Sequence, residues 1–480
     1  MTAPFMPVVE TKTDRFSKTE TVRFLSQCQQ QAADTNQPKI ASLAFKLAVI
    51  EPWVVLNTLG HLQKRHFYYD PPHQPSVVGI DVVVGFSSEG CTRFGQAQAF
   101  VQRWRSHFIY NTDTDTNSPL GRFFCSATFF EEAATVTRTI SSPQPEAFEP
   151  VYIFIPQVQV TTNAVFSTVT FNVLIDATTA IEQAADRLHQ QLTQLTSAKS
   201  IGTAQTASRK MVAKDVSGFA TAVQAILRPV KKGKLHKVVL ADVMDVVAPQ
   251  AIDEVRSLQT LRHNHPDCTV FAVGNGKGQS FIGASPERLL SIEQGQLITD
   301  ALAGSAPRSK LYGIDYQLAQ SLLHSQKERY EHNVVVDFIA GQLRSLGLMP
   351  HFTDAPQILR LAHIQHLHTP IRASLRTKTV SPLEILDKLH PTPAVAGLPR
   401  QLACELICQH ETFDRGLYAA PLGWIDTAGN SEFIVGLRSA LINGAKARLY
   451  AGAGIVAGSE PTKELAEIEL KLQTLLNALV

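Results

Sequence analysis

Strand-like segments of this chain follow one another without regular helices between them, and this order restricts the fold more than any other feature. Runs rich in Val, Phe and Thr succeed each other at 76–88, 121–130, 150–162 and 165–175. Strict alternation of strands and helices would indicate a parallel sheet with crossover helices. Because that alternation is missing, the sequence predicts a layered α+β fold with largely antiparallel sheets.

The remaining segments give the predicted element order. Helical spacing covers 17–65, and the polar stretch 197–210 is predicted to be a long connection. Further helices are predicted at 178–197, 215–229, 315–346, 381–389 and from 461 to the end, with strands at 237–247, 418–425, 432–443 and 447–456.

The composition excludes several classes of protein. Hydrophobic residues make up 44% of the 480, which is enough for a full core. Lysine and arginine total 44 against 42 aspartates and glutamates, without a long basic run, so nucleic acid is not an expected partner. No run of about 18 apolar residues occurs, so we expect no membrane span. Six cysteines are too sparse for a disulfide framework, and a reducing cytoplasm is the expected location.

Two predicted helices each carry a pair of glutamates three residues apart. The pairs are Glu328 with Glu331 and Glu464 with Glu467. Residues at this spacing share one helix face, so two such faces in contact would collect four carboxylates. Mutual repulsion requires a cation, and a hard divalent ion such as Mg²⁺ prefers oxygen ligands. The pattern predicts a Mg²⁺ site that holds an anionic substrate.

The glutamate pairs also have structural interpretations. Ser325 stands three residues before Glu328, a capping-box pattern in which the glutamate closes the helix end. Glu464 is a favourable acid for a first helical turn. Glu467 precedes Lys471 by four residues, which suits a surface ion pair. The sequence leaves these alternatives open.

Two further residues are candidates for moving protons. Lys237 begins an apolar strand, where desolvation would lower the pKa of its amine and make it a general base. A lysine at a sheet edge that extends to solvent is the alternative. Glu287 follows Pro286 at a bend, where burial would raise the pKa of the carboxyl group and let it donate a proton. A solvated turn is the alternative for Glu287.

The glycine-rich segment and a group of three histidines give weaker indications of function. Gly452, Gly454 and Gly458 have the wrong spacing for a dinucleotide loop, although their bare N–H groups can bind a carboxylate. The histidines at 363, 366 and 368 are interpreted as structural, because their strand-like run has no nearby acidic ligand for zinc.

Taken in order, these motifs resemble the chorismate-utilising enzymes, which include isochorismate, salicylate, anthranilate and aminodeoxychorismate synthases. The matching blocks are KVVLA (237–241), GASPERLL (283–290), TDALAGSAPR (299–308), SQKERYEH (325–332), HLHT (366–369), LHPTPAVAG (389–397), RGLYAAPLGW (415–424), GLRSAL (436–441) and YAGAGIVAGSEPTKELAEIELK (450–471). The first half of the chain resembles the family only loosely.

The resemblance implies a single structural domain with two mostly antiparallel sheets face to face and helices outside. Residues 1–215 would form its variable N-terminal half and 216–480 the chorismate-binding catalytic region. It implies Mg²⁺ as cofactor, with Glu331 and Glu467 as ligands supported by Glu328 and Glu464. The positions that match substrate-binding residues of the family are Gly304, Ser305, His390, Thr392, Tyr418, Arg438, Gly452 and Lys471.

The resemblance also implies the reaction. Water-using members have lysine at the position of Lys237, whereas ammonia-using anthranilate synthases have glutamine. Aminodeoxychorismate synthases have lysine where this chain has Ala303. The implied activity is isochorismate synthase: Lys237 as general base activates water for C2 of chorismate, and Glu287 as general acid protonates the departing C4 hydroxyl. No glutamine amidotransferase subunit is expected as a partner. The alternatives are a salicylate synthase, which then eliminates pyruvate, and a non-catalytic subunit of the same family.

Overall fold

The computed structural model describes residues 17–60, 63–111, 121–132, 148–198, 212–215, 218–362, 364–375 and 380–479. Most of the predicted connection at 197–210 lies outside these ranges, as do His363 and residue 216, where the predicted catalytic region begins.

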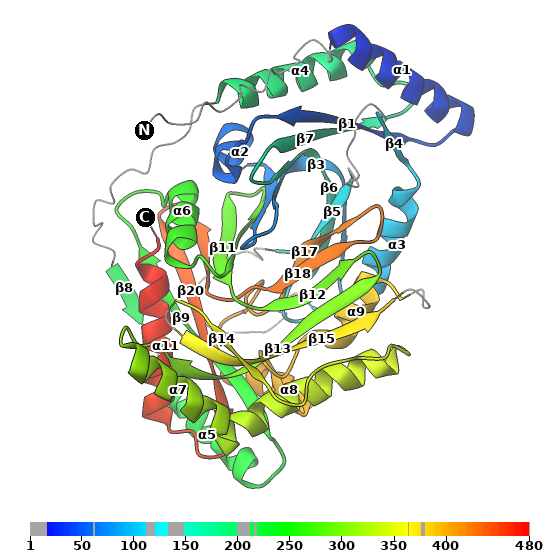
Figure 1. Cartoon of the computed structure of the whole chain (residues 1–480). Coiled ribbons are helices and arrows are strands. Elements are labelled where there is room, and N and C mark those ends of the chain that lie inside the picture. The colour runs from blue at the N-terminus through cyan, green and yellow to red at the C-terminus, as the bar shows by residue number, and fades with distance from the viewer. Residues whose placement is uncertain are drawn as a thin grey trace, which may run out of the picture.

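The strands form one continuous sheet that branches at β6 (Val151–Thr162). One edge of β6 pairs with β3 along its length. Its other edge pairs first with β5 (Arg122–Ala127) and then with β7 (Ser167–Ile175), so two arms leave this strand. Phe67 of one arm stacks on Phe124 of the other, with ring centroids 5.0 Å apart. The predicted α+β fold with two facing antiparallel layers is confirmed, and the layers are joined at β6 (Figure 1).

The first arm ends in the strands that carry Lys237 and the glycine-rich segment. In spatial order, the strands are β4 (Phe108–Tyr110), β1 (Lys39–Leu47), β7, β6, β3 (Ser76–Ser88), β2 (Arg65–Asp70), β10 (Thr269–Asn275), β11 (Gln279–Ser285), β19 (Ser439–Asn443), β20 (Lys446–Val456) and β9 (Lys237–Val247), with β8 (Val212–Asp215) and β16 (Gly397–Leu398) on the far edge of β9. Among the described strands, β1 and β4 are the only parallel neighbours.

The second arm carries the bend at Glu287. Its strands run in the order β5, β17 (Pro421–Asp426), β18 (Ser431–Val435), β12 (Arg288–Glu293), β13 (Gln296–Pro307), β15 (Ile364–Ser374) and β14 (Gln357–Arg360). Strands from both halves of the sequence pair with each other, as β2 with β10 and β5 with β17 show.

Helices cover the outside of both arms (Figure 1). They are α1 (Lys18–Thr35), α2 (Pro52–Leu59), α3 (Arg93–Arg105), α4 (Ile181–Ser197), α5 (Phe219–Lys231), α6 (Glu254–Asn264), α7 (Tyr312–His324), α8 (Gln326–Ser345), α9 (Pro382–Leu389), α10 (Arg400–His410) and α11 (Pro461–Leu476). α11 and α5 pack on β20 and β9, whereas α8 and α7 pack on β13 and β15. The two helices with glutamate pairs therefore belong to different arms.

The predicted helical stretch at 17–65 is partly wrong. It contains α1 and α2, but β1 at Lys39–Leu47 separates them. Residues 40–45 are buried on both faces of β1, so the strand lacks the alternation of apolar and polar residues that would have identified it. The predicted helix at 315–346 is two helices, because Ser325 has extended backbone angles, ends α7 and caps α8.

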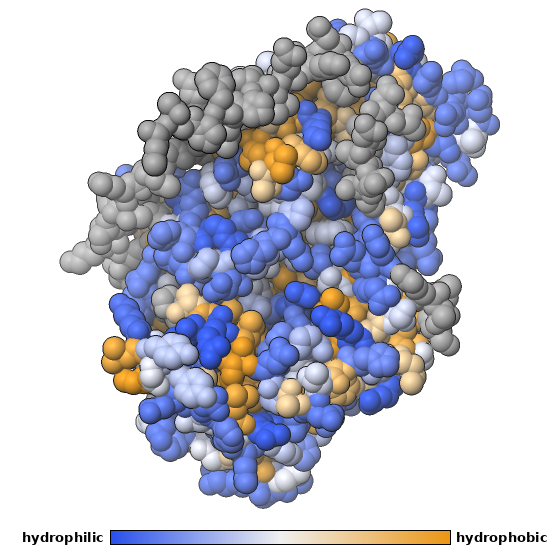
Figure 2. Space-filling view, in the orientation of Figure 1, coloured by the Kyte–Doolittle hydropathy of each residue, from blue (hydrophilic) through white to orange (hydrophobic). Residues whose placement is uncertain are grey.

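The apolar residues lie mainly in the core between the layers and under the helices. The face seen in Figure 2 is mostly hydrophilic, with small and separate hydrophobic areas. Within the described ranges, none of the helices combines the length and the hydrophobicity that a bilayer span requires.

Candidate active site

A cavity of about 280 Å³ lies between the two arms, lined by β9, β13, β20, α8, α11 and neighbouring loops. Twelve of the fourteen predicted site residues line it: Lys237, Glu287, Gly304, Ser305, Glu328, Glu331, Tyr418, Arg438, Gly452, Glu464, Glu467 and Lys471. The remaining two, His390 and Thr392, do not line it. Residues that are up to 234 positions apart in the chain, from 237 to 471, thus meet in one place.

Lys237 begins β9 and is 4% exposed. Its Nζ atom lies 2.8 Å from Oε1 of Glu331 on α8. Gly454 on the neighbouring strand leaves room for this contact, since a Cβ atom there would lie 3.2 Å from Lys237 Cε and 3.3 Å from Glu331 Oε1. Lys237 is therefore a buried, ion-paired residue of the cavity and does not extend to solvent.

The first turn of α8 aims both of its glutamates at the cavity. The Ser325 side chain accepts a hydrogen bond from the backbone N–H of Glu328, which starts the helix. The Glu328 carboxylate does not complete a capping box; it accepts a hydrogen bond from the Ser305 N–H at 3.3 Å. Burial raises the pKa of Glu328, and the negative charge of Glu331 raises it further. The sequence motif thus caps the helix through the serine alone.

Helix α11 presents the second pair of glutamates. Pro461 occupies its first turn, where a missing N–H costs nothing. Burial raises the pKa of Glu464, and the charges of Glu467 and Glu331 add to this rise, so carboxylates of α8 and α11 repel each other across the cavity. Glu467 is about half exposed and pairs with Lys471 at 2.6 Å. The predicted ion pair is present, and Lys471 also donates to the Gly452 carbonyl at 2.9 Å.

Glu287 stands at the bend between β11 and β12 and is 5% exposed. The Ser285 hydroxyl donates to the Val435 carbonyl at 2.6 Å, and the Val435 N–H donates to the Glu287 carbonyl at 3.1 Å, which fixes the bend. Burial raises the pKa of Glu287 to about 8; nearby Lys237 opposes this rise and Asp300 adds to it. The carboxyl group is therefore protonated at neutral pH, and the solvated-turn alternative is wrong.

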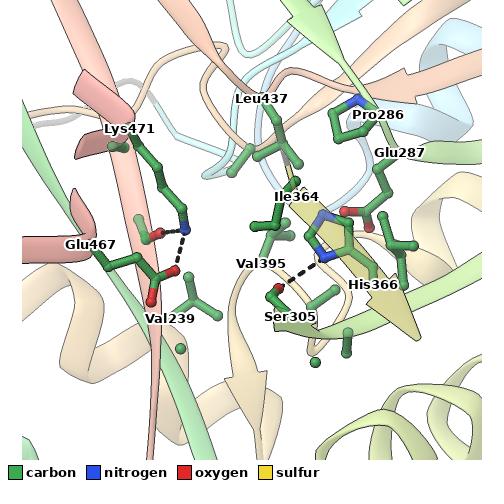
Figure 3. Close-up of a pocket in the computed structure, with 18 of the residues that line it drawn as sticks. Val239, Pro286, Glu287, Ser305, Ile364, His366, Val395, Leu437, Glu467 and Lys471 are labelled. Atoms are coloured by element: carbon green, nitrogen blue, oxygen red, sulfur yellow. Dashed lines mark hydrogen bonds and ion pairs between the residues drawn. The ribbon is translucent and has the colours of Figure 1, made fainter. Parts of the chain in front are cut away.

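A bulge in β13 shapes the wall next to α8. The register with β15 shifts between Ala303 and Ser305, and Gly304 has a φ of +74°. Ser305 and His366 Nδ1 are hydrogen-bonded at 2.9 Å. His366 Nε2 is buried without a hydrogen-bond partner among the described residues. Figure 3 shows His366 beside Glu287 on one side of the cavity, with Lys471 and Glu467 on the other.

His366 is a cavity residue that the sequence interpretation missed. Burial lowers its pKa to about 3, with a further contribution from the charge of Arg438, so the ring is neutral. The block HLHT carried a signal, but three closely spaced histidines were read together as structural. His368 lies on β15 outside the cavity lining, with Nε2 2.9 Å from Asp300 Oδ1.

A third group of residues surrounds the glycine-rich strand. A Cβ atom on Gly452 would lie 2.7 Å from the Tyr418 hydroxyl, so glycine is required for this approach. Burial strongly raises the pKa of Tyr418, which keeps the hydroxyl protonated. Arg438 has a φ of +47°, and its backbone carbonyl accepts from the Ala284 N–H at 3.2 Å. Hydroxyl, guanidinium and backbone donors are the groups that bind carboxylates.

His390 and Thr392 lie behind the cavity wall. His390 is buried and its Nε2 atom is 3.0 Å from the Phe129 carbonyl. Burial lowers the pKa of His390 to about 3. Ala394 and Val395, a few residues further along, line the cavity in their place. A motif match locates such a loop only to within a few residues, because it does not say which side chains turn inward.

Comparisons with known proteins agree with this geometry. Residues 23–480 match the chorismate-binding enzyme family. A salicylate biosynthesis isochorismate synthase from Pseudomonas aeruginosa is 44% identical over 253 residues, about half of each chain (52%). Isochorismate synthase MenF from Bacillus subtilis is 29% identical over 93% of this chain and 95% of its own length. The solved structure of the menaquinone-specific isochorismate synthase MenF from Escherichia coli has 25% identity, covers 95% of this chain and 99% of its own, and has a TM-score of 0.75.

The chain therefore belongs to the chorismate-binding enzymes, and the resemblance stated from its motifs is confirmed.

Proposed function

We propose that this protein is an isochorismate synthase, an isomerase that converts chorismate to isochorismate with Mg²⁺. The observation that carries the proposal is that Lys237, the buried Glu287 and four glutamates from two helices line one cavity. The proteins similar to this chain over most of its length support it, because they are named isochorismate synthases.

The proposed chemistry separates the two proton transfers. Lys237 takes a proton from a water molecule, which adds to C2 of chorismate while the ring double bonds shift. Glu287, protonated at neutral pH, gives its proton to the C4 hydroxyl, which leaves as water. Lys237 is an ammonium group while it pairs with Glu331, so it has to release a proton before its amine can accept one from water.

The donor set of the cavity fits Mg²⁺. Within the described part of the chain, no three His, Cys, Asp or Glu side chains form a ready-made metal site. Mg²⁺ does not need one, since it keeps several waters and is commonly held by one or two carboxylates plus the substrate. We assign Glu331 and Glu467 as ligands, with Glu328 and Glu464 supporting them. When bound, the cation would neutralise the ring carboxylate of chorismate and compete with Lys237 for Glu331.

The other cavity residues are assigned to the substrate. Tyr418, Arg438 and the Gly452 backbone would bind the enolpyruvyl carboxylate, whose negative charge suits their donors. Lys471 would lie near the ring carboxylate. Gly304 and Ser305 would line the ring, and His390 and Thr392 would support the wall from behind.

Water is the proposed nucleophile and not ammonia. Lysine at position 237 supports this choice, because the water-using members of the family have lysine there. Ala303, where aminodeoxychorismate synthases have lysine, lines the cavity. No glutamine amidotransferase subunit is then required. None of the six cysteines forms a disulfide, which suits the reducing cytoplasm proposed as the location.

The test is to incubate the purified full chain with chorismate, with and without Mg²⁺, and to separate the products. Isochorismate that forms only with Mg²⁺ is the expected result. Salicylate together with pyruvate would instead identify a salicylate synthase. No turnover at saturating Mg²⁺ would identify a non-catalytic member of the family and overturn the proposal.

A further inference from the structure

A buried ion pair lies directly behind the cavity wall. Arg415 and Glu411, between α10 and β17, have side chains 0% and 3% exposed. Arg415 Nε is 2.8 Å from Glu411 Oε2, and its Nη2 is 2.5 Å from Oε1. The guanidinium also stacks 4.3 Å from the centre of the Phe129 ring. Burial of two charges is costly, and apolar residues of similar volume are often as stable, so the pair is weak evidence of a large contribution to stability.

The outward hydrogen bonds of this pair reach two segments of the wall. Arg415 Nη2 donates to the Val239 carbonyl of β9 at 2.8 Å, and Nη1 donates to the Val395 carbonyl at 2.9 Å. Glu411 Oε1 accepts from the Ala241 N–H at 2.8 Å. Val239 and Val395 both line the cavity. One guanidinium therefore connects the strand of Lys237 with the neighbouring loop at Val395, and both segments line the cavity.

Among the described residues, the pair takes the place of a partner strand along part of the edge of β9. β16 pairs with this edge only at Lys237 and Val238, and β8 pairs with it only from Met244 onward. On this edge the Val239 N–H donates to the Ala396 carbonyl at 2.7 Å. The next two backbone groups along it are the Val239 carbonyl, which accepts from Arg415, and the Ala241 N–H, which donates to Glu411. Side-chain donors and acceptors thus continue the ladder where the backbone of β9 approaches the cavity.

We propose that Glu411 and Arg415 are positioning residues that set where Lys237 stands relative to the bound substrate. The proposal rests on the proposed isochorismate synthase activity and extends it beyond the residues that line the cavity. A planar guanidinium can hold Val239, Val395 and Glu411 in one plane, whereas an ammonium group cannot. Of the assigned substrate partners, Arg438, Gly452 and Lys471 lie on other segments. Tyr418 lies three residues after Arg415, but its N–H donates to the backbone carbonyl of Arg415 at 2.8 Å, which a side-chain substitution keeps, so substrate binding should survive the change.

The test uses Arg415→Lys, which keeps the charge but loses the fork. We expect kcat to fall by about 10- to 100-fold, the size of effect that a displacement of about 1 Å can cause. KM for chorismate should change by less than about threefold, since ground-state binding is retained. Arg448→Lys is the matched control: Arg448 makes a two-bond ion pair with Asp245 of β9 (2.7 Å each), outside the cavity lining. It should leave kcat and KM within about twofold.

Several outcomes would overturn the proposal. They are an unchanged kcat in Arg415→Lys, a rise in KM at constant kcat, or an equal fall in kcat in Arg448→Lys. If Arg415→Lys does not fold by circular dichroism, Glu411→Gln is measured in its place, with the same expected fall in kcat; failure of both to fold would assign the pair to stability alone. A wild type without turnover rejects the proposed function, whereas an active wild type that Arg415→Lys leaves intact rejects only the positioning role.

Discussion

The two walls of the cavity hold their charges differently. On one wall, where β9 and α11 of the first arm meet α8 of the second, lysines and glutamates form ion pairs, Lys237 with Glu331 and Lys471 with Glu467. On the side of β12, no ion pair to Glu287 occurs among the described residues, and burial raises its pKa to about 8. Partners thus stabilise charge on one wall, and burial without a partner keeps the acid neutral on the other.

This difference gives the two walls opposite tasks. A wall rich in paired charges can exchange partners with an anionic substrate and a cation at little cost in desolvation. A wall with a neutral carboxyl group and a neutral His366 can donate a proton or a hydrogen bond. The assignment of acid and base follows from this contrast, and changes on either side test it.

Removal of the base should have the largest effect. For Lys237→Ala we expect isochorismate formation to fall by about 10²- to 10⁴-fold, the usual contribution of a general base. Chorismate should still bind, which calorimetry would measure alongside steady-state rates. Lys463→Ala is the control, since this lysine of α11 is exposed and pairs with Glu460 outside the cavity lining. Isochorismate formation at the wild-type rate would refute the role of Lys237.

Removal of one carboxylate on the same wall should have a smaller effect. For Glu467→Gln we expect the affinity for Mg²⁺ to fall by about 10- to 100-fold, because the amide is a weaker ligand for a hard cation. Titration of activity with Mg²⁺ and direct calorimetry of Mg²⁺ binding both measure it. Glu460→Gln is the matched control, since Glu460 also pairs with a lysine of α11 but does not line the cavity. An unchanged metal titration would leave Glu467 as a surface ion pair with Lys471.

The sequence predicted the strands best where their polar and apolar pattern was unambiguous. The run KVVLADVMDVV gave β9 with the bounds that the structure has, 237–247. The strand at 39–47 was predicted as helix, because both of its faces are buried and it lacks an alternating pattern. The stretch 315–346 was predicted as one helix, because the serine that caps α8 also ends α7. Helical spacing also sufficed to put Glu328 with Glu331, and Glu464 with Glu467, on shared faces.

The sequence could not predict what these faces meet. That Lys237 pairs with Glu331, and that Glu411 and Arg415 hold the strand behind Lys237, depends on how segments more than 90 residues apart pack together. His366 was missed for the same reason, because its neighbours Ser305 and Glu287 come from another strand and a distant bend. Motif spacing describes one element at a time, whereas an active site is a relation between elements.

The smallest expected effect concerns the acid wall and its pH dependence. Burial is the main cause of the raised pKa of Glu287, and the positive charge of Lys237 opposes it. The negative charge of Asp300 raises this pKa further. Asp300 is held by His368 at 2.9 Å and by Arg288 at 3.7 Å. Since Glu287 must be protonated to act, wild-type kcat/KM should fall as the pH rises through about 8.

Asp300→Asn removes that charge, which favours ionisation of Glu287. The alkaline limb of the profile should therefore move to lower pH, by about one pH unit or less, with little change at pH 6. Asp245→Asn is the control, because Asp245 pairs with Arg448 away from the cavity lining and should leave the limb in place. A limb that stays fixed, or moves to higher pH, would show that another group controls the proton donor. The assignment of Glu287 as the proton donor on the unpaired wall would then be wrong.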